Sequence, residues 1–85
     1  MAWVYILKSQ RNGRYYVGHT TAIARRFAEH QDGKVKATRY LRPWTLAYSE
    51  EHADATAARK REWYLKQLKS RRALEELMAS TSGIP

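Results

Sequence analysis

The sequence lacks cysteine altogether and has no apolar run approaching the ~20 residues that a membrane-spanning helix requires. Without cysteine, disulfide bonds and thiolate zinc sites are excluded, and a cytoplasmic protein is expected. The apolar run near the N-terminus, Trp3–Leu7, is too short for a secretory signal peptide and has the composition of a β-strand. We therefore expect a soluble protein that has no membrane partner.

Acidic residues are scarce as well, because eight Asp and Glu stand against 16 Lys and Arg, giving a formal net charge of +8. This excess in a small chain favours a polyanionic partner, above all nucleic acid. Ribosomal and membrane-surface proteins share such a charge, so a basic structural protein, with RNA as its partner, is an alternative. The 85 residues predict one domain with a modest core, which we place at residues 1–79, followed by a flexible tail at residues 80–85.

Two runs of β-branched and aromatic residues, Trp3–Leu7 and Tyr15–Gly18, predict a β-hairpin, because the loop between them contains Asn12-Gly13. Residues two apart share one face of a strand, so Tyr5 and Tyr16 can share a face. A two-residue turn would leave them roughly 13 Å apart along the strand at about 3.3 Å per residue. A longer loop would bring them opposite one another, and we expect the longer loop.

A helix follows the hairpin. Thr20 or Thr21 can serve as its N-cap, Ile23 and Phe27 recur on one face, and Asp32-Gly33 provides a glycine C-cap. Arg26 and His30 are one turn apart on the shoulder of this apolar stripe, where both side chains can reach over the edge of the sheet. A half-buried histidine that only packs is the alternative for His30.

The connection from residue 34 to residue 43 is basic: it contains Lys34, Lys36, Arg39 and Arg42, with Tyr40 among them. Cationic groups beside an aromatic ring suit phosphate contacts and base stacking. A solvated loop that only keeps the protein soluble is the alternative. Alternation over Trp44–Ser49 then predicts a third strand, and Glu50-Glu51-His52 is expected to be a polar connection.

A second, longer helix is predicted from an N-cap at Asp54 to about Lys69. Its inward face carries Ala55, Ala58, Leu65 and Leu68, and Glu62 lies in the middle of that apolar stripe. An inward carboxylate requires a cation, a metal or hydrogen-bond donors, and a salt bridge to Arg26 is the structural alternative. A third helix, from about Arg71 to Met78, has Leu74, Leu77 and Met78 to pack. The predicted fold is α+β, a three-stranded antiparallel sheet flanked by helices in the order β-β-α-β-α-α.

These residues resemble the GIY-YIG endonuclease superfamily, most of all its small stand-alone bacterial members. Val4-Tyr5-Ile6 corresponds to the first phrase of the family and Tyr16-Val17-Gly18 to the second, although Val4 replaces a glycine. Arg26 and His30 match an Arg-x-x-x-His pattern on the first helix, and Glu62 matches the acidic position of the second. The resemblance covers residues 3 to 69.

The resemblance implies a metal-dependent endonuclease whose catalytic residues are Tyr5, Tyr16, Arg26, His30 and Glu62. Tyr5 would be the general base, which requires nearby cations because a phenol has a pKa near 10. Arg26 would bind the scissile phosphate, and Tyr16 and His30 would orient water and phosphate. Glu62 would bind one Mg²⁺ or Mn²⁺, completed by water and substrate oxygens. No small-molecule cofactor is implied.

The expected partner is DNA, bound by a basic set that comprises Lys34, Lys36, Arg39, Tyr40, Arg42, Lys60 and Lys66. Family members with a defined target carry an additional DNA-binding domain, for which this chain leaves no room. We therefore expect a structure-preferring or weakly sequence-specific nuclease in DNA repair or recombination, in the bacterial cytoplasm at the nucleoid. The alternative is a nucleic-acid-binding module with little activity of its own, which acts through a protein partner.

Overall fold

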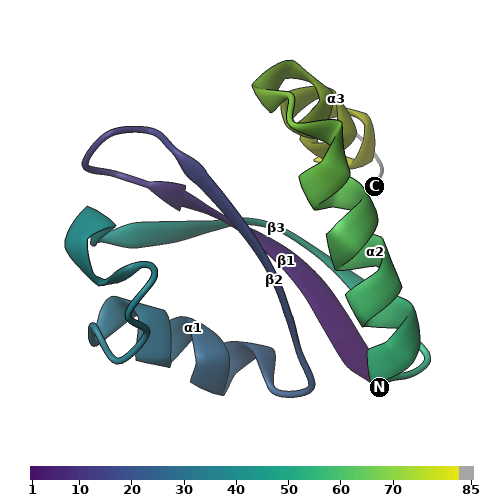
Figure 1. The fold of residues 1–85 in the computed structure, drawn as a ribbon, viewed down its shortest axis with the longest axis horizontal. Coiled ribbons are helices and arrows are strands. Elements are labelled where there is room, and N and C mark those ends of the chain that lie inside the picture. Colours follow the sequence, from purple (N-terminus) through teal and green to yellow (C-terminus); the bar gives the residue numbers. More distant parts are fainter. Residues whose placement is uncertain (83–85) are drawn as a thin grey trace.

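Strand β1 (Ala2–Ser9) is the centre of the fold, because its nearly continuous apolar sequence can be buried on both faces. It pairs antiparallel with β2 (Tyr15–Thr20) on one side and with β3 (Trp44–His52) on the other, in the order β2-β1-β3. The computed structural model describes residues 1–82 (Figure 1). The helices are α1 (Ile23–Gln31), α2 (Ala55–Leu68) and α3 (Arg71–Ser82), with a 3₁₀ turn, η1 (Arg39–Leu41), before β3. The predicted α+β fold is confirmed.

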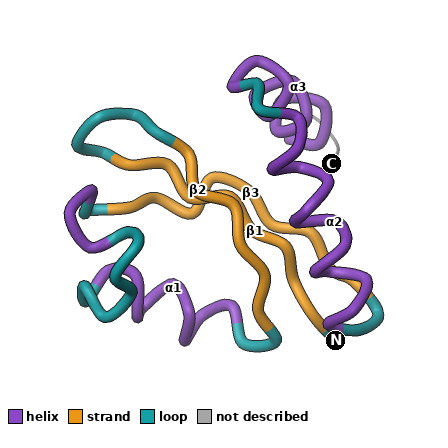
Figure 2. The backbone as a smooth tube through the Cα atoms, viewed as in Figure 1, coloured by secondary structure: helices purple, strands orange, loops and turns teal. Residues whose placement is uncertain are grey.

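Alternate residues of β1 face two separate cores. Val4 and Ile6 pack in one cluster with Ala58 and Leu65 of α2, to which α3 adds the partly buried Leu74, Leu77 and Met78. Tyr5 and Leu7 pack in the other with Trp44, and Ile23 and Phe27 of α1 cover that cluster. Helix α1 therefore lies on one face of the sheet, and α2 with α3 lies on the other (Figure 2).

The hairpin register determines where the two tyrosines stand. Tyr5 pairs with Gly18 and Leu7 pairs with Tyr16, and residues 10–14 form the connection. The prediction of a longer loop is confirmed, but the tyrosines are diagonal neighbours on one face and do not stand directly opposite. The loop is closed by the Ser9 amide, which donates to the Arg14 carbonyl at 2.8 Å.

Several predicted boundaries need correction. The N-cap of α1 is Ala22 and not Thr20 or Thr21; the Thr20 hydroxyl accepts from the Ala22 amide, two residues before the helical amides that a cap would bond. Residues Glu50-Glu51-His52 belong to β3 and are not a connection, because they pair with the first residues of β1. Ala55 is exposed in the first turn of α2 and does not face the core.

The predicted ends of α2 are confirmed. Asp54 caps it by accepting from the Ala57 amide at 2.8 Å, and Lys69 ends it in the left-handed region at φ 47°. Helix α3 runs to Ser82, four residues beyond the predicted end at Met78, so residues 80–82 of the expected tail are helical. The rest of that tail, residues 83–85, lies outside the described residues.

Candidate active site

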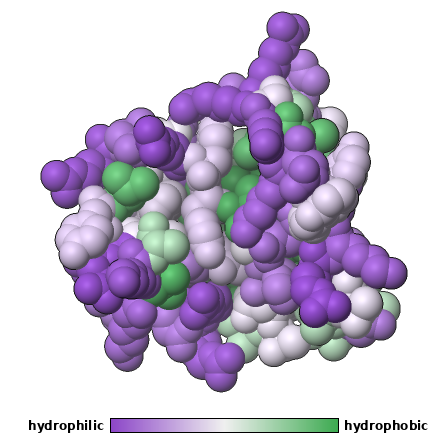
Figure 3. Space-filling view, in the orientation of Figure 1, coloured by the Kyte–Doolittle hydropathy of each residue, from purple (hydrophilic) through white to green (hydrophobic). Residues whose placement is uncertain are grey.

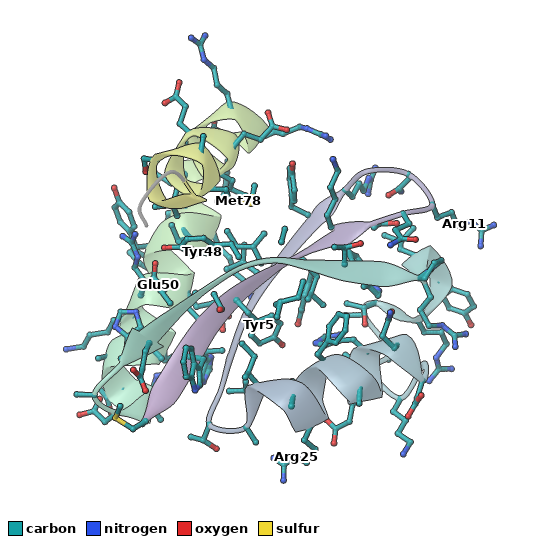
Figure 4. The ribbon with its side chains drawn as sticks, turned by 180° about the vertical axis from the view of Figure 1, so that it is seen from behind. Tyr5, Arg11, Arg25, Tyr48, Glu50 and Met78 are labelled. Atoms are coloured by element: carbon teal, nitrogen blue, oxygen red, sulfur yellow. The ribbon has the colours of Figure 1, made fainter. Side chains whose placement is uncertain are left out.

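The site is built around Tyr5 of β1 and His30 of the last turn of α1. Figure 4 shows Tyr5 between the sheet and α1. The Tyr5 hydroxyl lies 2.8 Å from Nε2 of His30, and the two rings meet edge to face at 5.7 Å. Nδ1 of His30 lies 2.7 Å from the hydroxyl of Thr38. His30 and Thr38 are both buried, so these contacts are shielded from water. His30 is therefore hydrogen-bonded through both of its ring nitrogens.

The protonation states follow from this burial. Desolvation, helped by the positive charge of Arg26, lowers the pKa of His30 to about 4, so its ring is neutral at pH 7. Desolvation also raises the pKa of Tyr5 to about 12, so the phenol keeps its proton. The Tyr5 hydroxyl therefore donates to Nε2, and Nδ1–H donates to Thr38, whose hydroxyl donates on to the Val35 carbonyl at 3.4 Å. Arg26 favours ionisation of Tyr5, as expected of a nearby cation, but the effect of burial on the pKa of Tyr5 is larger.

Tyr16 completes an aromatic group on this face. Its ring lies 5.2 Å from that of His30 and 6.5 Å from that of Tyr5. Gly18, the pairing partner of Tyr5, explains how the phenol fits: a Cβ atom there would lie 2.6 Å from the Tyr5 hydroxyl oxygen. Any side chain at this position would displace Tyr5, which makes glycine a requirement of the site.

Arg26 belongs to the same group. Its guanidinium interacts with the Tyr5 hydroxyl and lowers the pKa of Tyr5 against the larger effect of burial. Nη1 of Arg26 also pairs with Oε1 of Glu29 at 3.0 Å, and this pair is about one-third exposed. Arg26 is thus a positive group at the solvent edge of the site, held by a carboxylate that an incoming phosphate can replace.

Glu62 lies on α2, on the other face of the sheet. Its carboxylate pairs with Nδ1 of His19 at 2.5 Å and with Nζ of Lys66 at 2.7 Å, and not with Arg26. Burial raises the pKa of Glu62, but these two partners outweigh it and hold the pKa below its usual value, so the group is ionised at pH 7. Lys66 is also 5.8 Å from the centre of the Tyr16 ring.

The predicted catalytic residues thus lie on both sides of the edge strand β2. Tyr5, Tyr16, Arg26 and His30 form one group on the α1 face. Glu62 lies across β2 and is connected to that group through Lys66, while its negative charge contributes to the raised pKa of Tyr5. The structure brings four of the residues together and places the fifth beside them.

Comparison with known protein families shows which family the chain belongs to. The GIY-YIG catalytic domain matches residues 1–75, nearly the whole chain. The chain belongs to the GIY-YIG family. It is also similar to small UPF0213 proteins, with 39% identity to one from Desulfotalea psychrophila (96% of this chain, 76% of that one) and 41% to one from Halobacterium salinarum (80% and 88%). The solution NMR structure of the UPF0213 protein BH0048 from Bacillus halodurans matches with a TM-score of 0.62 and 35% identity over 98% of this chain and 88% of that one.

The GIY-YIG assignment makes this a nuclease domain, for which DNA is the implied substrate. His19, the partner of Glu62, is a residue that the sequence analysis missed. It directly follows Gly18, and strand alternation places it on the opposite face from Tyr16, towards α2. That alternation was the available signal, but its partner is 43 positions away on a helix.

The predicted DNA-binding residues of this GIY-YIG domain fall into two groups. Lys34, Lys36, Arg39, Tyr40 and Arg42 lie in the segment between α1 and β3, and Lys60 and Lys66 lie on α2, on the opposite side of the sheet. All are exposed except Arg39, which is partly buried. Figure 3 shows hydrophilic side chains over most of one face, with apolar groups confined to patches between them. No helix within residues 1–82 is long and apolar enough to cross a membrane.

GIY-YIG nucleases generally use a divalent metal ion, and in this site a single carboxylate could bind it. Residues 1–82 contain no cluster of three or more histidine, cysteine, aspartate or glutamate side chains suited to a metal. Glu62 is ionised and partly exposed, which suits a hard divalent cation, but both its oxygens already accept from His19 and Lys66. A metal would therefore need Lys66 to move away and substrate oxygens to complete its shell. The residues fit a metal that binds together with DNA.

Proposed function

We propose that this GIY-YIG protein is a Mg²⁺- or Mn²⁺-dependent DNA endonuclease that hydrolyses phosphodiester bonds with weak sequence preference, in DNA repair or recombination in the bacterial cytoplasm. The observation that carries the proposal is the buried hydrogen-bond chain from Tyr5 through neutral His30 to Thr38, with Arg26 at its open edge. A buried tyrosine that is hydrogen-bonded to a neutral histidine supplies the donor and acceptor that a proton transfer between them requires.

In this proposal Tyr5 and His30 act together as the general base. Tyr5 takes a proton from the attacking water while its own proton passes to Nε2 of His30, 2.8 Å away. The imidazolium that forms keeps its Nδ1–H bond to Thr38. This relay removes the need for a phenolate, which a pKa of about 12 makes rare at pH 7.

The other residues bind and orient the phosphate. The water oxygen forms the new bond to phosphorus as the bond to the 3′ oxygen breaks, and Arg26 stabilises the added negative charge on the phosphoryl oxygens. Tyr16 orients the phosphate beside His30. A divalent metal held by Glu62 would neutralise the leaving 3′ oxygen. Lys66, released from Glu62, would bind a neighbouring phosphate.

The test compares two glutamates of one chain. Glu62→Gln removes the proposed metal ligand, and Glu76→Gln is the matched control, because Glu76 also pairs one turn away, with Arg72, but on the exposed face of α3. Linear, nicked, flapped and branched DNAs are incubated with each protein in Mg²⁺, in Mn²⁺ and in EDTA. We expect cutting only with metal. Glu62→Gln should cut at least ~100-fold more slowly, since a metal supplies several kcal/mol and each ~1.4 kcal/mol is tenfold.

Thermal melting and DNA binding separate this loss from unfolding. Glu62→Gln should melt within a few degrees of Glu76→Gln and bind DNA at least as tightly, because a negative charge has gone. A large loss of melting temperature together with unchanged cutting by the folded fraction would overturn the metal-ligand role of Glu62.

A second candidate function is favoured by the pairing of Glu62 with both His19 and Lys66, which satisfies the carboxylate without any metal. On this interpretation the domain binds DNA, cuts little by itself and acts through a protein partner. The same assay distinguishes the two candidate functions, because a binding module would bind every DNA in the panel in EDTA and cut none of them with metal.

A further inference from the structure

Three arginines surround a surface depression at one end of the sheet. Arg11 comes from the hairpin loop, and Arg39 and Arg42 come from η1 and the residue after it; Gln31, Tyr40 and Pro43 complete the lining. The loop and η1 are far apart in the sequence but lie at the same end of the sheet, with Arg11 at its outer limit (Figures 1 and 4).

These three guanidinium groups carry uncompensated charge. None pairs with a carboxylate of residues 1–82, whereas Arg26, Arg61, Arg71 and Arg72 all do. The Nε–H of Arg39 is buried and donates to no atom of the described residues. A buried donor without an acceptor is unfavourable, so an anion that supplies oxygen atoms here would relieve that cost.

Two of the three arginines, Arg11 and Arg42, are held in place by backbone carbonyls, with no carboxylate involved. Nη1 of Arg11 donates to the Tyr40 carbonyl at 3.3 Å, and Nε of Arg42 donates to the Arg39 carbonyl at 2.7 Å. Arg42 also lies against Gly33, where a Cβ atom would come within 2.7 Å of its guanidinium carbon. Their remaining N–H groups stay available to a ligand, so the charge is positioned before anything binds.

The ring of Tyr40 indicates which anion fits. Tyr40 is 71% exposed, lines the same depression and has the guanidinium of Arg39 5.9 Å from its ring centre. An exposed aromatic ring among phosphate-binding cations suits a nucleotide, because the base can stack while the phosphate binds the arginines. An acidic peptide would leave the ring without a partner.

We propose that Arg11, Arg39 and Arg42 form a subsite for a backbone phosphate of a DNA strand, with the adjacent base stacked on Tyr40. This deepens the proposed function and rests on it, since it names where the strand binds outside the catalytic group. It also adds Arg11, from the hairpin, to the expected DNA-binding residues.

The subsite has a fixed spacing from the catalytic group. Arg39 directly follows Thr38, which binds His30, and the Thr38 carbonyl accepts from Nε1 of the buried Trp44 at 3.0 Å. Ser9 at the end of β1 donates to the Leu41 carbonyl at 2.7 Å, which ties η1 to the strand that carries Tyr5. A strand bound in the subsite would therefore be held at a defined distance from Tyr5, and this would select which phosphate is cut.

The test measures binding of short fluorescent single-stranded DNA by anisotropy in EDTA, so that no cutting is needed. Arg11→Gln and Arg42→Gln each remove one guanidinium of the subsite. Arg25→Gln is the matched control, because Arg25 is exposed, makes no ion pair within residues 1–82 and projects from α1 away from the sheet (Figure 4). Thermal melting of each variant shows that it is folded.

We expect Arg11→Gln and Arg42→Gln to bind about tenfold more weakly than wild type, as for loss of one charged hydrogen bond, while Arg25→Gln stays within about twofold. The slope of log affinity against log salt should fall by about 0.7 in each subsite variant. Tyr40→Leu should weaken binding at least about fivefold with an unchanged slope, since stacking releases no ions.

Equal affinities for Arg11→Gln, Arg42→Gln and Arg25→Gln would overturn the subsite. This outcome is independent of the proposed nuclease activity, which is judged by metal-dependent cutting and its loss in Glu62→Gln. Conversely, if the protein never cuts DNA but both arginine variants bind it more weakly, the proposed nuclease activity is refuted and the subsite is supported.

Discussion

Burial of a neutral histidine makes the stability of this domain depend on pH in a way that can be calculated. His30 has an ordinary pKa near 6.5 in the unfolded chain, and burial lowers its pKa to about 4 in the folded one. Between these values the unfolded state binds a proton that the folded state does not. The free energy of unfolding is therefore fully retained above about pH 6.5 and falls as the pH drops towards 4.

The magnitude follows from the same two pKa values. A difference of about 2.5 units at ~1.36 kcal/mol per unit is worth about 3 kcal/mol in total, of which about 2 kcal/mol is lost by pH 5. A domain of this size has roughly 4–13 kcal/mol of stability, so the loss is a large share. His30 is fully buried, so solvent screening does not reduce it.

Urea unfolding between about pH 7 and pH 4.5 measures this loss in wild type, in His30→Gln and in His52→Gln. His30→Gln is less stable at pH 7, because the Tyr5 and Thr38 contacts change, but its midpoint should be nearly constant down to pH 5. His52→Gln keeps His30 and should decline like wild type. If wild type and His30→Gln lose stability in parallel, burial does not hold His30 neutral, and the proton relay from Tyr5 loses its acceptor.

Two further substitutions test the geometry of the site. Tyr5→Phe removes the hydroxyl that donates to His30, so we expect roughly 1–3 kcal/mol less stability and a cutting rate reduced by about 10²–10⁴. Urea titration measures the stability and a nicking assay measures the cutting rate, with Tyr64→Phe, at a half-exposed tyrosine, as the control. Cutting by Tyr5→Phe at the wild-type rate would exclude Tyr5 as the base. Gly18→Ala places a methyl group 2.6 Å from the Tyr5 hydroxyl oxygen and should cost about 1–3 kcal/mol through displacement of that ring, with cutting reduced as well. A melting temperature and activity equal to wild type would show that Tyr5 moves freely and that glycine is not required there.

The amino-acid sequence by itself determined the order of elements and their faces, because these depend on neighbours in the chain. The apolar run Trp3–Leu7 predicts a strand, and the Asp54 cap and the glycine after α1 mark helix ends through local backbone chemistry. Alternation and helical spacing likewise placed Tyr5, Tyr16, Arg26 and His30 on surfaces that face one another.

Contacts between distant segments were decided by the tertiary structure alone. The partner of Glu62 on another element is His19, 43 residues away, whereas the sequence predicted a metal, with a salt bridge to Arg26 as the alternative. The polar end of β3 reads as a loop, yet it becomes a strand because β1 supplies the hydrogen-bond partners. No local pattern predicts such pairings, since they depend on which surfaces meet.

The protonation states were likewise beyond the sequence. The family resemblance makes Tyr5 a general base that requires nearby cations, but the folded domain raises the pKa of Tyr5 to about 12 because α1 and β2 exclude water from the ring. The same exclusion leaves His30 neutral, and the meeting of the hairpin loop with η1 gathers Arg11, Arg39 and Arg42 around one depression. Desolvation and the summed field of charges are properties of the packed molecule. The sequence therefore specifies which ionisable groups are present, and the fold determines whether each of them is charged.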